Sequence, residues 1–161
     1  MRKYLTKKNK SNDSLPIILI DSREKKPWTF SMYATESQCL SVGDYTFKGY
    51  EDVFVIERKQ NIQELLTDVA GKNRKWFKEF LARLSTVKHA IIVVEDSADN
   101  LSNALNHIGK SEMTGQTFYW LMSTIVLKYG ITVLFVGKNF RVRTGDVDTF
   151  FYHLFEELKG L

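Results

Sequence analysis

The hydrophobic positions of this chain repeat with two different periods, which separate predicted strands from predicted helices. Short apolar runs rich in Ile and Val are typical of buried strands, whereas apolar residues three or four positions apart indicate a helix with one buried face. By these criteria we predict strands at 15–21, 41–47, 53–58, 89–95 and 131–136. We predict helices at 62–84, 100–108, 117–129 and 148–158, the first of them interrupted at 71–73. The polar segment 22–35 is predicted to be mostly loop.

The order of these elements argues for one α/β domain, with a mixed central β-sheet flanked by helices. The strands at 41–47 and 53–58 are separated only by the turn-like segment 48–52, so we expect them to form a β-hairpin. A chain of 161 residues is about the size of one ordinary domain. We therefore assign 15–161 to a single domain and 1–14 to a basic, flexible tail.

Composition excludes several classes of protein. Hydrophobic residues make up 43% of the chain and charged residues 26%, as in globular proteins. No apolar run approaches the roughly 18 residues that a membrane span needs, and the polar, basic start is not a secretory signal. The single cysteine, Cys39, excludes an internal disulfide and fits a reducing, intracellular compartment, with the cytoplasm of a prokaryotic host as the expected location. We expect Cys39 itself to be a small, partly buried side chain.

The net charge of +4 is concentrated in the tail, where five of the first ten residues are basic and none is acidic. Two interpretations of the tail remain open, a solvated disordered segment and an arm that contacts phosphates. Since the rest of the chain is nearly neutral, net charge alone does not establish nucleic-acid binding.

The predicted hairpin carries the residues with the clearest chemistry. Its register places Asp44 directly opposite Glu57, with Cβ atoms roughly 5 Å apart on one face. Two carboxylates so placed repel each other unless a cation lies between them, and Mg²⁺ or Mn²⁺ prefers such oxygen ligands. Lys59 lies two residues beyond Glu57 and therefore on the same face. This set suits the hydrolysis of a phosphodiester, although a surface ion pair on a half-exposed strand remains the alternative.

Three short motifs, each at the end or on the face of a predicted strand, together resemble the signature of the XPF nuclease family. In chain order they are Asp21-Ser22-Arg23-Glu24, Gly43-Asp44-Tyr45 and Glu57-Arg58-Lys59. The resemblance covers the chain from about Leu15 onward. It implies a restriction-endonuclease-like core and metal-dependent cleavage of branched or flapped DNA. We expect a compact, stand-alone form, without the helix-hairpin-helix module of the larger family members.

The resemblance also implies roles for individual residues. Asp44 and Glu57 would bind Mg²⁺ or Mn²⁺, and Lys59 would be catalytic. Arg58 belongs to the same motif but alternates to the opposite face of the strand, so we expect it to pair with an acid. The residues expected beside the metal site, where they would assist it or hold its ligands in place, are Asp21, Arg23 and Glu24.

Two positions in or near the predicted helix at 62–84 also follow from the resemblance. Arg74 falls where the family often has an arginine, so Arg74 and the neighbouring Lys72 are candidates for gripping a DNA phosphate. The alternative for Arg74 is an ordinary cation on a helix surface. The family motif usually has an acid four residues after the lysine, where this chain has Gln63, with Glu64 next to it.

Two further questions remain open at this point. The domain is expected to be an active endonuclease, but a catalytically inactive copy that binds DNA or serves as a scaffold is the alternative. We also expect a homodimer built on the C-terminal helices, because both helices are rich in large apolar residues. The alternative is that these two helices cover each other within one monomer. The expected partners are DNA and a second copy of the chain, with no membrane.

Overall fold

The computed structural model describes residues 15–69, 73–108, 115–143 and 145–161. The strands are β1 (Ile18–Asp21), β2 (Thr35–Gln38), β3 (Tyr45–Phe47), β4 (Phe54–Lys59), β5 (His89–Val94) and β6 (Thr132–Phe135). The helices are α2 (Ile62–Val69), α3 (Arg74–Leu84), α4 (Leu101–Ile108), α5 (Gly115–Ser123) and α6 (Asp146–Lys159). A short 3-10 turn, η2 (Ala98–Asn100), precedes α4, and a π-helical turn, η3 (Thr124–Lys128), continues α5.

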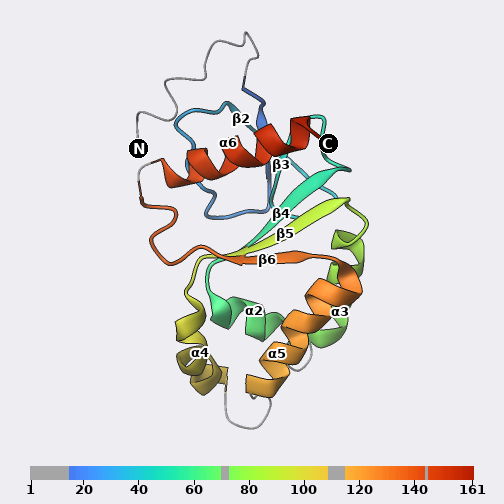
Figure 1. The fold of residues 1–161 in the computed structure, drawn as a ribbon, viewed down its shortest axis with the longest axis vertical. Helices are drawn as coiled ribbons and strands as arrows, with labels where there is room; N and C mark the ends of the chain where they lie inside the picture. The colour runs from blue at the N-terminus through green and yellow to red at the C-terminus, as the bar shows by residue number, and fades with distance from the viewer. Residues whose placement is uncertain (1–14, 70–72, 109–114, 144) are drawn as a thin grey trace.

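The domain has three layers, with the sheet between α6 on one side and α2, α3, α4 and α5 on the other (Figure 1). The six strands lie in the order β2-β1-β3-β4-β5-β6. β3 runs antiparallel to both β1 and β4, whereas β1–β2, β4–β5 and β5–β6 are parallel pairs. The predicted α/β architecture, with a mixed sheet that contains a hairpin and is flanked by helices, is confirmed, and the hairpin strands β3 and β4 lie in the middle of the sheet.

The hairpin of β3 and β4 has the register that the sequence predicted, because Tyr45 pairs with Ile56. One step along this register lie Asp44 and Glu57. All six residues of β4 are buried, and it pairs on its other side with β5 over its whole length. The strand that carries Glu57, Arg58 and Lys59 is therefore held on both sides in the middle of the sheet.

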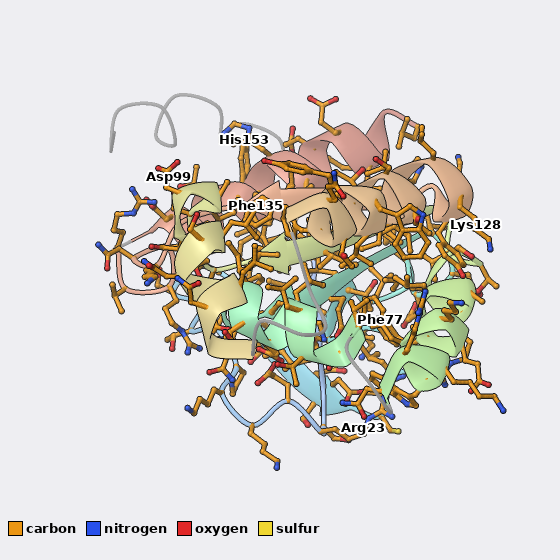
Figure 2. The ribbon with its side chains drawn as sticks, turned by 90° about the horizontal axis from the view of Figure 1, so that it is seen from below. Arg23, Phe77, Asp99, Lys128, Phe135 and His153 are labelled. Atoms are coloured by element: carbon orange, nitrogen blue, oxygen red, sulfur yellow. The ribbon has the colours of Figure 1, made fainter. Side chains whose placement is uncertain are left out.

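Each face of the sheet has its own hydrophobic core. The face toward α6 is covered by an aromatic cluster in which Trp28 stacks on Tyr45 and Phe151 packs edge-on against both. Trp28 lies in the loop after β1, yet it is only 2% exposed and so belongs to this core. The face toward α2–α5 is covered mainly by aliphatic side chains and by Phe77, which Figure 2 shows on the inner side of α3.

Strand β2 is missing from the sequence-based prediction, which extended the loop over its first residue. Its four residues, Thr35–Gln38, are all exposed. It lies at the edge of the sheet and pairs only with β1, so it buries no side chain on either face. Because alternating burial is the signal that identifies a strand in a sequence, a fully exposed edge strand gives none.

The two C-terminal helices lie on opposite faces of the sheet, so the alternative in which they cover each other is wrong (Figure 1). Phe118 and Leu121 of α5 belong to the core beneath α2 and α3, whereas Phe151 of α6 belongs to the aromatic core. Phe155 of α6 packs against the ring of Phe47, with ring centroids 5.1 Å apart. Much of the apolar surplus of α6 is therefore used within the monomer.

Other expectations are met differently or lie outside the described residues. Cys39 is exposed, which contradicts the expectation of a partly buried side chain. The tail at 1–14 and Lys72 fall outside the residues that the structure describes. Among the residues that it does describe, no helix is both long enough and apolar enough to cross a bilayer.

Candidate active site

The approach of Asp44 to β4 depends on the glycine before it. Gly43 has a φ of 76°, in the left-handed region, and a Cβ atom placed on it would lie 2.2 Å from Cγ2 of Val55. Without that atom the backbone comes close enough for the Asp44 N–H to donate to the Ile56 carbonyl at 2.7 Å. The Asp44 carboxylate in turn accepts a hydrogen bond from the Arg58 N–H at 2.7 Å. The backbone therefore fixes this carboxylate beside β4.

Asp44 and Glu57 are a pair of carboxylates whose charged forms are disfavoured. Burial, followed by repulsion from Glu57, raises the pKa of Asp44 to about 8. Burial also raises the pKa of Glu57, although Lys59 partly counters that effect. A cation bound near Asp44 and Glu57 would lower both pKa values, because it stabilises the ionised form of each acid.

Lys59 is held between two carboxylates. Its Nζ lies 2.9 Å from Oε1 of Glu57 and 2.8 Å from Oδ2 of Asp68, in the last turn of α2. Burial alone would lower the pKa of Lys59, but the two acids outweigh it and raise the pKa above its usual value. Lys59 is thus a permanent ammonium ion, and its ion pair with Glu57 connects it to the pair of acids.

Sequence reasoning missed Asp68. It looked for a supporting acid at position 63, which holds Gln63, a partly buried residue whose Oε1 has no hydrogen-bond partner. Asp68 lies one helical turn beyond Glu64, so these two acids share a face of α2. That i, i+4 pair of acids, placed just after the Glu-Arg-Lys motif, is the signal that could have identified it.

Arg58 extends to the other side of β4 and pairs with acids there, as its position in the strand predicted. Its guanidinium forms a buried ion pair with Glu95, at the end of β5, and lies 3.4 Å from Oε2 of Glu24. Glu95 also accepts a hydrogen bond of 2.7 Å from the indole N–H of Trp28. Arg141 adds a second cation 3.7 Å from the same carboxylate. Glu95 is therefore the centre of a buried polar cluster that the sequence did not reveal.

The first motif lies at the rim of the same region. Asp21, at the end of β1, accepts hydrogen bonds of 2.8–2.9 Å from the Arg23 side chain and one of 2.8 Å from the Leu40 N–H. Burial alone would raise the pKa of Asp21, but these hydrogen bonds lower it below its usual value. Since its oxygens are already paired, Asp21 anchors the mostly exposed Arg23, which Figure 2 shows on the side of the molecule that carries α2 and α3.

These side chains surround one cleft of about 310 Å³. It brings together residues from the loop after β1, the hairpin, β4, α2 and α3. The residues that line it include Asp21, Arg23, Glu24, Gly43, Asp44, Glu57, Arg58, Glu64, Trp76, Phe80 and Arg83. All the predicted site residues of the three motifs except Lys59 line this cleft, and Lys59 contacts it through its ion pair with Glu57.

The two residues predicted to bind a DNA phosphate are Arg74 and Lys72. Arg74 is exposed at the start of α3, with its guanidinium carbon 5.8 Å from the centre of the Trp120 ring, and it does not line the cleft. Lys72 lies outside the described residues. Binding of DNA by either residue stays a prediction.

The donor atoms of the cleft suit a hard divalent cation. Asp44 and Glu57 offer carboxylate oxygens, which Mg²⁺ and Mn²⁺ prefer. Within the described part of the chain, no group of three or more His, Cys, Asp or Glu side chains is arranged to hold a metal. A site of two carboxylates fits Mg²⁺, which commonly binds through one or two carboxylates, keeps several waters and takes other oxygens from a substrate phosphate.

Comparison with known proteins identifies the family. Residues 20–139 match the ERCC4 domain, the XPF-type nuclease domain, so this chain belongs to that family. Among solved structures it resembles XPF from Aeropyrum pernix, with a TM-score of 0.57 and 19% identity over 79% of this chain and 56% of that one. A structure of the same protein in complex with DNA gives a TM-score of 0.59 and 19% identity over 80% of this chain and 60% of that one.

The likeness to these structures supports the fold, and this chain spans a little over half the length of those solved chains. No curated protein sequence matches it.

Proposed function

We propose that this domain is a metal-dependent DNA endonuclease that cleaves branched or flapped DNA. The observation that carries the proposal is the pair of buried acids, Asp44 and Glu57, beside the ammonium of Lys59 in an open cleft. Two neighbouring buried carboxylates are costly without a cation, and a metal ion that assists hydrolysis would supply that cation. Membership of the XPF-type nuclease family and the likeness to a protein solved with DNA point the same way.

In this proposal Asp44 and Glu57 hold Mg²⁺ or Mn²⁺, which supplies Lewis-acid stabilisation of the phosphoryl oxygens and acidifies a water molecule. Lys59 keeps its proton, because Glu57 and Asp68 raise its pKa, so it acts as a fixed positive charge and not as a general base. An ammonium has three N–H groups, so its two carboxylate partners do not exhaust its capacity to donate to a phosphoryl oxygen or a water. Asp21, Arg23 and Glu24 hold the rim of the site.

Cleavage of a panel of labelled DNAs tests the proposal. The panel contains flap, fork, junction and linear duplex substrates of one sequence, each incubated with Mg²⁺, Mn²⁺ or EDTA. We expect branched substrates to be cut with either metal and none to be cut in EDTA. The variant Asp44→Asn should lose cleavage, whereas Glu36→Gln, which alters an exposed acid paired with Lys48, should retain it. A protein that binds these DNAs but cuts none would support the inactive scaffold instead.

Binding of the metal is measured separately. Calorimetric titration of Mn²⁺ into the wild type should show binding that Asp44→Asn abolishes or greatly weakens, because one of two carboxylate ligands loses its charge. Equal affinity in both proteins would contradict the assignment of Asp44 as a ligand.

We also propose that the domain forms a homodimer. In α5 and η3 the exposed fractions are 65% for Tyr119, 50% for Trp120, 47% for Val126 and 84% for Leu127, which leaves large apolar side chains uncovered. A patch of this kind commonly marks an interface.

Light scattering tests the dimer, because a monomer has a mass of 18.7 kDa. We expect a doubled mass that Leu127→Glu lowers. Phe155→Glu is a poorer test, since it would also disturb the packing of Phe155 on Phe47. A wild-type mass of one chain would contradict the dimer.

A further inference from the structure

One wall of the cleft is formed by α3, whose residues Trp76, Phe80 and Arg83 all line it. They are spaced four and three positions apart and so lie on one face of the helix. Phe80 is only 6% exposed, whereas Trp76 is 50% exposed. Their rings are stacked, with centroids 5.6 Å apart and an interplanar angle of 12°. The Nζ of Lys59 lies 5.8 Å from the centre of the Phe80 ring. The stacked rings of Phe80 and Trp76 thus lead from the neighbourhood of Lys59 to the exposed surface of the cleft.

A single exposed tryptophan is ordinary on a protein surface, but two features distinguish Trp76. It shares the cleft with Asp44 and Glu57, where the phosphodiester must lie if the domain is a nuclease. Its helix is also strongly basic, with a single acid, Glu79, and four cations. These cations are Arg74, Lys75, Lys78 and Arg83. A flat aromatic face among positive charges is the combination that binds single-stranded nucleic acid, because each nucleotide has a planar base and a negative phosphate.

We propose that Trp76 stacks on an unpaired base of the DNA strand whose phosphodiester lies at Asp44 and Glu57. This inference rests on the proposed function and specifies its substrate. In a continuous duplex both faces of each base are covered by neighbouring base pairs, so an indole finds no free face. Only a base at a flap, a fork or a strand end leaves one open. The domain therefore selects a strand with an unpaired nucleotide close to the bond that is cut.

The packing beneath Trp76 supports this role. Because Phe80 is buried and its ring stacks with the indole, it restricts the orientations that Trp76 can adopt. A base stacked on the outer face then lengthens an existing stack, and little rotamer entropy is lost on binding. Arg83 lies one turn beyond Phe80 on the same face of α3, where it can contact a phosphate of the bound strand.

Binding to two DNAs of equal length, a fork with a single-stranded arm and a blunt duplex, tests the inference. Affinities are measured by anisotropy in EDTA, where no cleavage takes place. We expect Trp76→Ala to weaken binding of the fork by about 5- to 100-fold, the loss of one base–aromatic stack. Binding of the duplex should change less than about twofold, because all its bases are paired and only the outer faces of its two terminal base pairs are open. The variant Trp76→Phe keeps an aromatic face, so it should retain most of the wild-type affinity for the fork. Thermal melting shows whether each variant is folded.

Fluorescence gives a second readout that does not depend on activity. The chain has three tryptophans, of which Trp28 is buried, and Trp76 and Trp120 are each 50% exposed. The matched variants Trp76→Phe and Trp120→Phe each remove one of the half-exposed indoles. Since a stacked nucleobase quenches indole emission, single-stranded DNA should quench the Trp120→Phe protein and leave the Trp76→Phe protein nearly unchanged.

The outcomes separate this inference from the proposed function. If the wild type cuts branched DNA but Trp76→Ala binds the fork as tightly as the wild type, the stacking is wrong and the nuclease stands. Equal weakening of fork and duplex, or quenching that persists in Trp76→Phe, would also overturn the stacking. If the wild type binds the fork in the way described here but cuts no DNA with either metal, the stacking stands and the nuclease falls. A wild type that binds no DNA would overturn both.

Discussion

The two sides of strand β4 handle buried charge in opposite ways. On the side facing α6, Arg58 is enclosed by Glu95 and Glu24, and Trp28 donates a further hydrogen bond to Glu95. On the side facing α2 and α3, burial and mutual repulsion raise the pKa of Asp44 to about 8, and burial raises that of Glu57. Consecutive residues of one strand thus belong to a charge-balanced cluster and to an acid pair that lacks sufficient positive charge.

The difference indicates what each cluster does. A buried ion pair with good geometry and additional hydrogen bonds is self-sufficient, and removing one partner leaves the other charge stranded. An acid pair that is strained without a cation is poised to bind one, at the expense of stability in its absence. We therefore propose that the Arg58 side stabilises the sheet and that the Asp44 side carries the chemistry of the proposed nuclease. Three measurements can break or sharpen this division.

The largest effect is expected on the balanced side. Glu95→Ala removes the buried partner of Arg58 and the hydrogen-bond acceptor of Trp28, so we expect a loss of about 3–5 kcal/mol in the free energy of unfolding. Urea denaturation followed by circular dichroism measures it. Glu36→Ala, which removes an exposed ion pair with Lys48, should change the same quantity by less than about 1 kcal/mol. If both variants unfold at the same urea concentration, the buried cluster does not stabilise the fold.

The next effect concerns Lys59. Lys59→Ala removes a fixed positive charge from the acid pair, and we expect turnover of a cleavable DNA to fall by about a hundredfold or more, as for loss of a transition-state stabiliser. DNA affinity in EDTA should change little, because Lys59 is buried. The matched variant Lys48→Ala removes an exposed lysine from the same hairpin and should retain full turnover. Near-normal turnover in Lys59→Ala would assign the catalytic role elsewhere.

The smallest effect is a gain of stability. Below about pH 4 the side chain of Asp44 is protonated in both the folded and the unfolded chain. Between about pH 4 and 8 the unfolded chain releases this proton and the folded chain keeps it, so the raised pKa of Asp44 lowers stability as pH rises. An asparagine in its place cannot ionise, and it can still accept from the Arg58 N–H. Asp44→Asn should therefore stabilise the fold in EDTA by about 1–3 kcal/mol at pH 8 and much less at pH 5.

Thermal melting at the two pH values measures this gain. Asp52→Asn, at an exposed position in the hairpin turn, is the matched control and should show no such pH dependence. A destabilised Asp44→Asn protein, or a gain that does not grow between pH 5 and pH 8, would mean that Asp44 is ionised without penalty in the fold.

The sequence was sufficient to predict the positions of candidate site residues that lie within one hairpin. The register of the hairpin and the period of β4 were enough to place Asp44, Glu57 and Lys59 together and to direct Arg58 to the other side. Asp68 and Glu95 were missed because helix packing brings Asp68 to Lys59, and the parallel β4–β5 pairing brings Glu95 to Arg58. Such contacts between separate elements leave no periodic trace in a single sequence.

The close approach at Gly43 bears on how active members of such a family are told from retired ones. A sequence comparison that checks only for the charged site residues would classify a chain with alanine at position 43 as active. Yet one methyl group there would lie 2.2 Å from Cγ2 of Val55 and 3.1 Å from the Ile56 carbonyl oxygen, so the backbone that positions Asp44 would have to move away from β4. The acid would be present in the sequence and misplaced in space. A side chain at position 43 is therefore expected to displace Asp44 even where both carboxylates are still present in the sequence.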